Sequence, residues 1–252
     1  MEFPLARTTV PELRVETRAG STNSVLLDLA GREPVPSWTT VVTTDQTAGR
    51  GRLDREWVAA PGDALAISVL VREISGRDWM PWIPLAAGVA MTDAVAALVG
   101  GAARLKWPND VLVGGAKISG ILAEIAPGGH DVVIGAGVNL RQGAADLPVA
   151  TATSLALVGV TVTDAVADEL LARYLSRLRE LLDGEPSRAA LRRTVLDRCL
   201  TIGRMVSVDP LGGSTFTGRA VDLDEDGRLR VEDDAGRVHT VAAADVVHAR
   251  AV

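Results

Sequence analysis

A glycine pair between two apolar runs constrains the fold of this 252-residue chain more than any other segment. Residues 111–113 and 117–125 flank Gly114-Gly115, and such glycines supply the positive φ that tight hairpin turns require. A second pair, Gly128-Gly129, leads into another apolar run at residues 132–140. This region therefore predicts consecutive antiparallel strands.

Periodicity predicts the elements around these strands. Leu13 and Val15 alternate with polar residues, as in a half-buried strand. Two more apolar runs read as strands, the second apolar enough for the middle of a sheet, at residues 39–44 and 64–72. Apolar residues at helical spacing predict four helices, at residues 22–30 after a Ser21 N-cap, 84–99, 164–182 and 187–200.

The pattern of apolar runs and turns changes at Gly203. Five short apolar runs separated by Gly- or Asp-rich turns follow, around Val206, Thr217, Leu229, Val238 and Val246. This pattern predicts a small all-β barrel over residues 203–252, after a larger domain of strands and helices over residues 1–202. The many acids between Asp222 and Asp234 are expected to form a solvated face.

Composition limits the class of protein. With 47% hydrophobic and 23% charged residues the chain is an ordinary globular one, and its net charge of −6 argues against coating nucleic acid or an anionic membrane. The lone Cys199 and three scattered histidines leave no disulfide framework and no metal-binding cluster. The start of the chain does not resemble a signal sequence, and residues 147–163 are too polar to span a membrane, so a cytoplasmic protein is expected.

Only two of the 26 basic residues are lysines, Lys106 and Lys117, and they lie close together. A chain that uses arginine for its other positive charges does not need lysine for general solubility. We expect these two where a compact ammonium is required and a planar guanidinium will not fit. The chain after Lys117 is apolar or small, so an inward-pointing ammonium would need an anion beside it. The alternative is a place on the outer face of the hairpin.

Two polar segments carry candidate chemistry. In residues 45–57, two glycines alternate with Arg50 and Arg52 after a predicted strand, which favours a loop that binds phosphate or carboxylate; the alternative is a flexible surface turn. In residues 106–110, Pro108 predicts an extended peptide that presents a cation, an amide and an acid. The alternative there is a plain turn into the hairpin.

In this order the segments resemble the catalytic domain of biotin protein ligases. The resemblance covers nearly the whole chain: Ser21-Thr22-Asn23, residues 46–57, 106–110, 117–122 and 135–140, and the C-terminal β region. It implies an α+β fold, with a mixed β-sheet flanked by helices and a small C-terminal SH3-like β-barrel. It resembles the form lacking the N-terminal DNA-binding domain, because the chain begins at the first catalytic strand, and operator binding is not expected.

The resemblance implies a two-step reaction. ATP and biotin give biotinyl-5′-AMP and pyrophosphate, and the acceptor lysine of a biotin carboxyl carrier protein then displaces AMP. Mg²⁺ is expected with ATP, held mostly by the phosphates because the sequence shows no dedicated set of ligands. No DNA or membrane partner is expected, and the enzyme is expected to be a monomer or a weak homodimer.

The resemblance also assigns residues to roles. Lys117, Arg50 and Asp110 would be catalytic: Lys117 bridges the biotin carboxylate and the α-phosphate, and Asp110 orients the acceptor lysine. Biotin would contact Ser21, Thr22, Asn23, Gln46, Arg50, Gly51, Arg52 and Lys117. The adenylate or ATP would contact Arg52, Arg55, Trp57, Lys106, Asn109 and Asn139. No residue is assigned to a metal.

One departure from the family lies inside the basic loop, where Asp54 replaces a frequent glycine and could weaken the hold on phosphate. Three alternatives stay open. A lipoate protein ligase would share the fold and the adenylate chemistry but not the Gly-Arg-Gly-Arg loop. An octanoyltransferase would need a thiol nucleophile, for which Cys199 is the candidate. A non-catalytic biotin-sensing module would not need Lys117.

Overall fold

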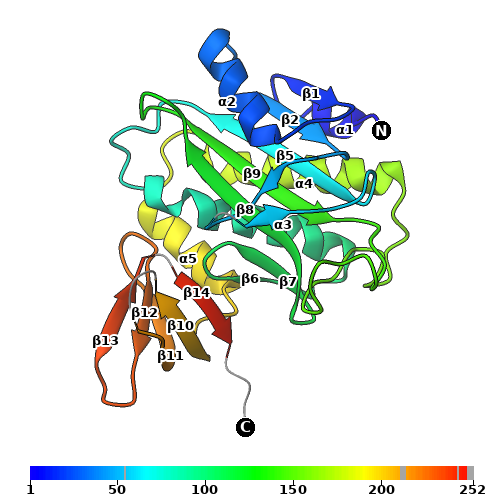
Figure 1. Cartoon of the computed structure of the whole chain (residues 1–252). Coiled ribbons are helices and arrows are strands. Elements are labelled where there is room, and N and C mark those ends of the chain that lie inside the picture. Colours follow the sequence, from blue (N-terminus) through cyan, green and yellow to red (C-terminus); the bar gives the residue numbers. More distant parts are fainter. Residues whose placement is uncertain (54, 211–213, 243, 249–252) are drawn as a thin grey trace.

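A seven-stranded sheet organises most of the chain (Figure 1). The computed structural model describes residues 1–53, 55–210, 214–242 and 244–248. Across the sheet the strands run in the order β1 (Leu13–Glu16), β2 (Thr40–Thr43), β5 (Ala64–Val71), β9 (Val132–Asn139), β8 (Ala116–Ile125), β7 (Asp110–Val113) and β6 (Ala103–Lys106). β1 and β2 are parallel and the other neighbours are antiparallel, so the predicted mixed sheet is confirmed.

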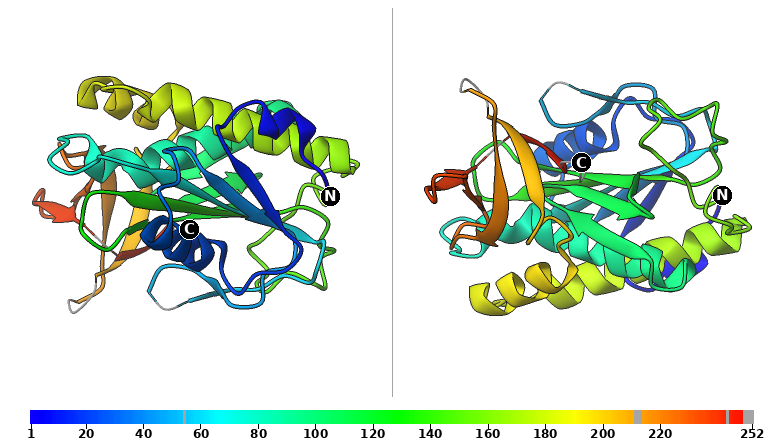
Figure 2. Two further views of the ribbon diagram at one scale, coloured as in Figure 1. Left: turned by 90° about the horizontal axis from the view of Figure 1, so that it is seen from above. Right: turned by 90° about the horizontal axis from the view of Figure 1, so that it is seen from below.

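Helices cover the two faces of this sheet unequally (Figure 2). One face packs against α3 (Ile83–Leu98), and both α4 (Asp164–Leu182) and α5 (Arg188–Arg198) pack on α3; a short α1 (Pro4–Arg7) packs on α4. The opposite face carries α2 (Thr22–Arg32) over β2, β5 and β9. A two-stranded ribbon of β3 (Gly49–Arg50) and β4 (Glu56–Trp57) lies in front of this second face. Residues of both the ribbon and α2 line one pocket.

The apolar helix α3 is the core helix of the fold. Together with the 3₁₀ turn η1 (Met80–Trp82) it is long and apolar enough to cross a membrane, but 67% of that window is buried inside the fold. Its side chains, including Leu85, Val89 and Met91, join those of the sheet and α4 in one hydrophobic cluster. Burial between two layers therefore explains why this helix is apolar all round.

The C-terminal region forms a five-stranded antiparallel sheet. In spatial order its strands are β13 (Val238–Val241), β12 (Leu229–Glu232), β11 (Phe216–Leu223), β10 (Met205–Pro210) and β14 (Ala244–His248). All five predicted runs are therefore strands, and the small sheet fits the expected SH3-like fold. The predicted domain boundary at residue 203 falls in the turn before β10.

The turn between β11 and β12 joins the two sheets. The indole N–H of Trp82 donates to the carbonyl oxygen of Glu225 (2.8 Å), and that of Trp107 donates to the carbonyl oxygen of Gly227 (3.0 Å). The side chains of Glu225 and Asp226 are exposed, as predicted, but Gly227 is buried. The acidic side chains are thus partly or fully solvated, as expected, while the backbone of this turn packs on the larger domain.

The sequence analysis did not predict four short elements, α1, β3, β4 and β6, which have two to four residues each, and one expectation about α2 needs revision. Ser21 does precede α2, but its hydroxyl makes no capping hydrogen bond. The free amide of Thr22 donates to Gln46 Oε1 (2.9 Å) instead. A side chain from a distant loop therefore caps this helix, and Ser21 lines a pocket.

Candidate active site

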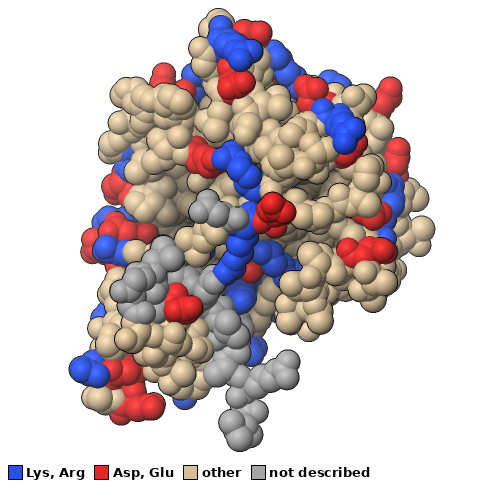
Figure 3. Space-filling view, viewed as in Figure 1, with Lys and Arg blue, Asp and Glu red and all other residues tan. Residues whose placement is uncertain are grey.

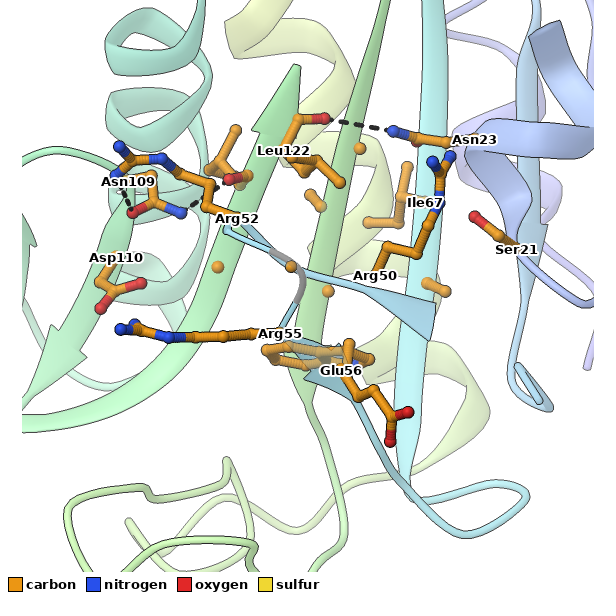
Figure 4. Close-up of a pocket in the computed structure, with 18 of the residues that line it drawn as sticks. Ser21, Asn23, Arg50, Arg52, Arg55, Glu56, Ile67, Asn109, Asp110 and Leu122 are labelled. Carbon is orange, nitrogen blue, oxygen red and sulfur yellow. Dashed lines mark hydrogen bonds between the residues drawn. The ribbon is translucent and has the colours of Figure 1, made fainter. Parts of the chain in front are cut away.

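A pocket of about 330 Å³ opens on the sheet face that carries α2, a volume in the range of small-molecule sites. Basic side chains gather along a hollow in this front face (Figure 3). With one exception, every residue that the sequence assigned to the site lines the pocket: Ser21, Thr22, Asn23, Gln46, Arg50, Gly51, Arg52, Arg55, Trp57, Lys106, Asn109, Asp110 and Lys117. Figure 4 shows Ser21 and Asn23 at one end and Arg52, Asn109 and Asp110 at the other.

Cross-strand rows on β5, β9 and β8 form the floor of the pocket. The register aligns Ser68, Gly135 and Leu122 in one row and Ala66, Gly137 and Gly120 in the next. Glycine is required at two of these positions. A Cβ on Gly135 would lie 2.5 Å from Asn23 Oδ1, and a Cβ on Gly137 would lie 2.5 Å from the ring of Trp57. Both side chains therefore rest directly on the backbone of β9.

Uncharged side chains form one end of the pocket, the amide side, which we define as Ser21, Thr22, Asn23 and Gln46. Gln46 Oε1 accepts from both the backbone N–H and the hydroxyl of Thr22, at 2.9 and 3.2 Å. Asn23 Oδ1 lies 2.5 Å from the hydroxyl oxygen of Ser68. Asn23 is only 4% exposed, and Ser68 is fully buried. Thr22, Asn23 and Ser68 are buried and hydrogen-bonded within the protein, so they hold their positions without a ligand.

Positive charges form the other end, the basic side, which we define as Arg52, Arg55, Lys106 and Lys117. The Lys117 ammonium lies 2.5 Å from a carboxylate oxygen of Asp110. Arg52 donates to Asn109 Oδ1 at 3.3 Å (Figure 4). Both arginines come from the loop between β3 and β4, whereas the lysines come from β6 and β8. Four cations from three parts of the chain thus converge beside one paired carboxylate.

The electrostatics of the basic side favour an incoming anion. Burial lowers the pKa of Lys106 below its usual range, the nearby charge of Asp110 opposes that shift, and the charges of Lys117 and Arg55 add to it. Burial likewise lowers the pKa of Arg52, with Asp110 again opposing the shift. In both groups the protein disfavours the charged form relative to water. A bound phosphate or carboxylate would reverse that penalty.

A β-bulge in β8 aims Lys117 into the pocket. The pairing of β7 with β8 shifts by one residue at Ile118, between Lys117 and Ser119. Ile118 is buried in the main core, while Lys117 shares the pocket face with Gly120, where a Cβ would lie 3.2 Å from Lys117 Nζ. Bulges often redirect side chains beside functional sites. Lys117 therefore points inward with Asp110 as its anion, and the outer-face alternative is wrong.

Residues 106–110 are both a turn and a part of the site. They form a turn that connects β6 to β7, with a cis peptide bond before Pro108, and the expected extended peptide does not form. Asn109 Nδ2 donates to the carbonyl oxygen of Ile121 (2.8 Å), which fixes the turn against β8. The Trp107 indole points instead toward the C-terminal sheet. The turn thus presents its polar residues to the pocket and its aromatic ring to the core.

Sequence reasoning missed Ser68 and Glu124. Glu124 lies on β8 and accepts hydrogen bonds from Arg50 (2.8 Å) and Asn23 (2.6 Å). A signal for it was present, because Glu124 follows Gly120 at the two-residue spacing that keeps side chains on one face of a strand. Ser68 gave no such signal, since its role depends on pairing with β9.

Asn139 is the exception among the assigned residues. It is 5% exposed and does not line the pocket. Its amide donates to the carbonyl oxygen of Thr153 (2.8 Å) and accepts from Gln142 Nε2 (3.0 Å). These bonds hold the loop that follows β9, so the geometry does not support the adenylate contact expected of Asn139. The expectation for Asp54 falls on a residue outside the described part of the chain.

Cys199 and the acidic groups outside the pocket are the other candidates for a reactive centre. Cys199 is 8% exposed, lies outside the pocket, and has its pKa raised by burial, so it is not placed to act as a thiolate nucleophile. Among residues 1–53, 55–210, 214–242 and 244–248, no group of three or more His, Cys, Asp or Glu could hold a metal ion. The chemistry of this protein is therefore to be sought in the front-face pocket.

Comparison with known proteins first defines a class. Residues 15–139 match the model of the Biotin/lipoate A/B protein ligase family, and residues 201–249 match that of the Biotin protein ligase C terminal domain. The solved structure of the biotin protein ligase from Aquifex aeolicus in complex with biotin and ATP superimposes with a TM-score of 0.76 at 25% identity. That likeness covers 95% of this chain and 100% of the Aquifex chain.

Two relatives found by sequence comparison show to which family of ligases the chain belongs. The biotin–[acetyl-CoA-carboxylase] ligase of Mycobacterium tuberculosis is 39% identical over 246 residues, which are 95% of this chain and 90% of that protein. The ligase of the same description from Paracoccus denitrificans is 35% identical, over 91% of this chain and 97% of its own. The chain belongs to the biotin protein ligase family and is a ligase.

Proposed function

We propose that this ligase activates biotin with ATP and transfers it to the acceptor lysine of a biotin carboxyl carrier protein domain. One observation carries the proposal: an uncharged amide side and a basic side face the same pocket. The amide side matches the ureido ring of biotin, whose N–H and C=O groups need uncharged partners. The basic side matches a polyphosphate. The Aquifex relative with biotin and ATP bound has the same fold.

The first step needs positive charge between the two ends. A biotin carboxylate oxygen attacks the α-phosphorus, the bond to the β-phosphate oxygen breaks, and pyrophosphate leaves. Lys117 lines the pocket as a compact point charge, and it would neutralise both the carboxylate and the α-phosphate. Arg52 and Arg55 would hold the leaving pyrophosphate, because guanidinium groups bind phosphate oxygens in pairs. Arg50 and Gly51 would cover the bound intermediate.

The second step needs an acid near the mixed anhydride. The acceptor amine attacks the biotinyl carbonyl carbon, the acyl–phosphate bond breaks, and AMP leaves. Asp110 would orient the acceptor ammonium and accept its proton, since it already binds one ammonium, that of Lys117, at 2.5 Å. Phosphate binding to Lys117 would free this carboxylate for the incoming lysine.

The nucleotide and its metal would depend on both protein and phosphate groups. Trp57 is proposed to stack near the adenine, and Lys106 and Asn109 to contact the adenylate. Asp110 and Glu56 are carboxylates that line the pocket, and Asp110 is already paired with Lys117. Mg²⁺ would therefore take most of its ligands from the phosphates and water, as Mg²⁺ commonly does.

Pyrophosphate exchange into ATP tests this function directly. Purified protein should exchange pyrophosphate in the presence of biotin and not of lipoate, and should then label an isolated carrier domain on one lysine. Exchange with lipoate and none with biotin would identify the protein as a lipoate ligase. Biotin binding without exchange would identify a sensing module.

Three further expectations accompany this proposal. We expect the enzyme in the cytoplasm. We expect a monomer or weak homodimer, which sedimentation would show, and no sequence-specific binding to DNA. A salt-resistant gel shift with a defined operator would contradict the last expectation.

A further inference from the structure

One carboxylate oxygen connects the amide side to the ribbon. Glu124 Oε2 accepts from Asn23 Nδ2 at 2.6 Å and from an Arg50 guanidinium nitrogen at 2.8 Å. Asn23 belongs to the start of α2 and Arg50 to β3, so two separate elements meet at a single acid on β8. No step of the proposed reaction uses Glu124, and its contacts therefore need another explanation.

The carboxylate fixes the orientation of the Asn23 amide. Carboxylate and carbonyl oxygens only accept hydrogen bonds. Asn23 Nδ2 therefore directs its hydrogens to Glu124 and to the carbonyl oxygen of Leu122 (3.3 Å). Asn23 Oδ1 must then face Ser68, whose hydroxyl can donate to it. Without the charged acceptor only the longer bond to the Leu122 carbonyl oxygen would favour this orientation, because the Ser68 hydroxyl pairs equally well with a donor or an acceptor.

The orientation decides what the amide side offers to a ligand. Both Nδ2 hydrogens of Asn23 have protein partners, so Asn23 has only a lone pair of Oδ1 left to give. A lone pair beside the pocket floor accepts an N–H of a ureido ring. A rotated amide would present an N–H there and would repel that ring.

The second partner of Glu124 holds the ribbon. Arg50 reaches from β3 to Glu124 and approaches Ser24 Oγ at 3.3 Å (Figure 4 shows Arg50 beside Asn23). The ribbon is only two strands of two residues, and such a hairpin has little stability of its own. The ion pair therefore draws the ribbon over the amide side.

We propose that Glu124 is a positioning residue that, through one carboxylate oxygen, sets the hydrogen-bonding polarity of Asn23 and holds the Arg50 ribbon over the amide side. The ligand named in this inference rests on the proposed function. The contacts of Glu124 do not, because they join parts of the protein alone.

The isosteric variant Glu124→Gln tests the polarity of the amide. Its side-chain amide can donate or accept, so only the 3.3 Å bond to the Leu122 carbonyl oxygen still favours one orientation of Asn23. In biotin-dependent pyrophosphate exchange, the KM for biotin should rise about tenfold, the effect of losing one hydrogen bond to a charged group. The KM for ATP and kcat should change by less than about threefold. Glu169→Gln is a matched control, because Glu169 pairs with Arg173 at 2.7 Å on α4, outside the pocket.

Limited trypsin cleavage tests the ribbon without substrates. Trypsin cuts after arginine, and Arg50, Arg52 and Arg55 place sites within the ribbon and its loop. In Glu124→Gln these bonds should be cut up to about fivefold faster, the effect of losing an exposed ion pair. Cleavage elsewhere should keep its rate, and Glu169→Gln should match the unmodified protein.

The two readouts separate this inference from the proposed function. If the unmodified protein shows no exchange with biotin but Glu124→Gln loosens the ribbon, the proposed function fails and the holding role stands. If exchange occurs and Glu124→Gln changes neither the KM for biotin nor ribbon cleavage, the role of Glu124 is refuted. Equal loss of all kinetic parameters together with a lower Tm would also refute it, since that pattern is general destabilisation.

Discussion

The amide side and the basic side of the pocket are built on opposite principles. On the amide side Asn23 is 4% exposed, and its polar atoms are paired within the protein. On the basic side the Lys117 side chain is 34% exposed, and burial, together with the charges of Lys117 and Arg55, lowers the pKa of Lys106. The amide side has its hydrogen bonds without a ligand, whereas the basic side carries an excess of positive charge until an anion binds.

The difference follows from the cost of burying each kind of group. An uncharged amide can be buried at little cost once it is hydrogen-bonded, and it then recognises a ligand by shape and polarity. Several cations cannot be buried together without a counter-charge. The basic side therefore stays partly open, with Asp110 as its temporary partner. Recognition is thus preformed at one end, and charge stabilisation waits for the substrate at the other.

The largest expected effect comes from removing the central cation. Lys117→Ala should reduce biotin-dependent pyrophosphate exchange by at least about a hundredfold, in the range seen when a transition-state donor is lost. Biotin binding by calorimetry should weaken but remain measurable, because the contact of Lys117 with the carboxylate is lost while the amide side is untouched. Lys117→Arg should not restore the rate, because a guanidinium is larger than an ammonium. Lys117 Nζ already lies close to Gly120, 3.2 Å from where a Cβ of that residue would be. Full activity of Lys117→Ala would disprove the mechanism.

The preformed end should be broken by a single methyl group. In Gly135→Ala the new Cβ would lie 2.5 Å from Asn23 Oδ1, so the amide must shift. Overpacking of this kind costs roughly 1–3 kcal/mol, which corresponds to about a 5- to 150-fold rise in the KM for biotin, with the KM for ATP unchanged. Gly31→Ala in α2 is the control, since its Cβ would meet nothing within 4 Å. A normal KM for biotin in Gly135→Ala would show that the amide side is not rigid.

A substitution on the basic side should have a smaller effect, and it should change the KM for ATP rather than the KM for biotin. Arg52→Ala removes one guanidinium that lines the pocket and donates to Asn109. We expect the KM for ATP to rise roughly tenfold, the effect of one lost charged hydrogen bond, while the KM for biotin stays the same. Arg173→Ala on α4 serves as a control. A rise in the KM for biotin alone would contradict the division into two sides.

The smallest effect concerns stability and its dependence on pH. Burial, reinforced by Lys117 and Arg55 and opposed by Asp110, lowers the pKa of Lys106 in the folded state. Folding therefore disfavours the ammonium, and this cost disappears as pH rises through the folded pKa toward the unfolded one. Lys106→Met should raise the Tm at pH 7 by roughly 2–4 °C, as about 1 kcal/mol does in a protein of this size. The gain should shrink near pH 10.5 in calorimetric scans; a gain independent of pH would exclude this cause.

The sequence predicted the regular elements well, because burial and turn chemistry are local signals. Gly114 and Gly115 both have positive φ in the hairpin that they were expected to form. The five C-terminal strands followed from runs separated by turns. In contrast, the ribbon of β3 and β4 could not be predicted, because each of these strands has only two residues and one of the two is charged.

The site was predictable as a set of residues but not as a geometry. Motifs brought Lys117 and Asp110 to attention, yet their ion pair depends on a bulge that moves one side chain across the sheet. Ser68 and Glu124 act through strand register, which a single sequence does not display. Asn139 shows the reverse case: it belongs to a recognisable motif, but its amide is turned toward the loop after β9.

The indoles of Trp82 and Trp107 tie the C-terminal sheet to the larger domain, so that the two form one cooperative unit. Both rings are at most 2% exposed, and their N–H groups end on backbone carbonyls of the turn at Glu225 and Gly227. Detaching that sheet would leave the two indole N–H groups without acceptors and would expose two large apolar rings to water. Its melting therefore cannot be separate from that of the larger domain. A protease or mutation that loosens this small sheet would also loosen the turn that carries Lys106 and Asp110.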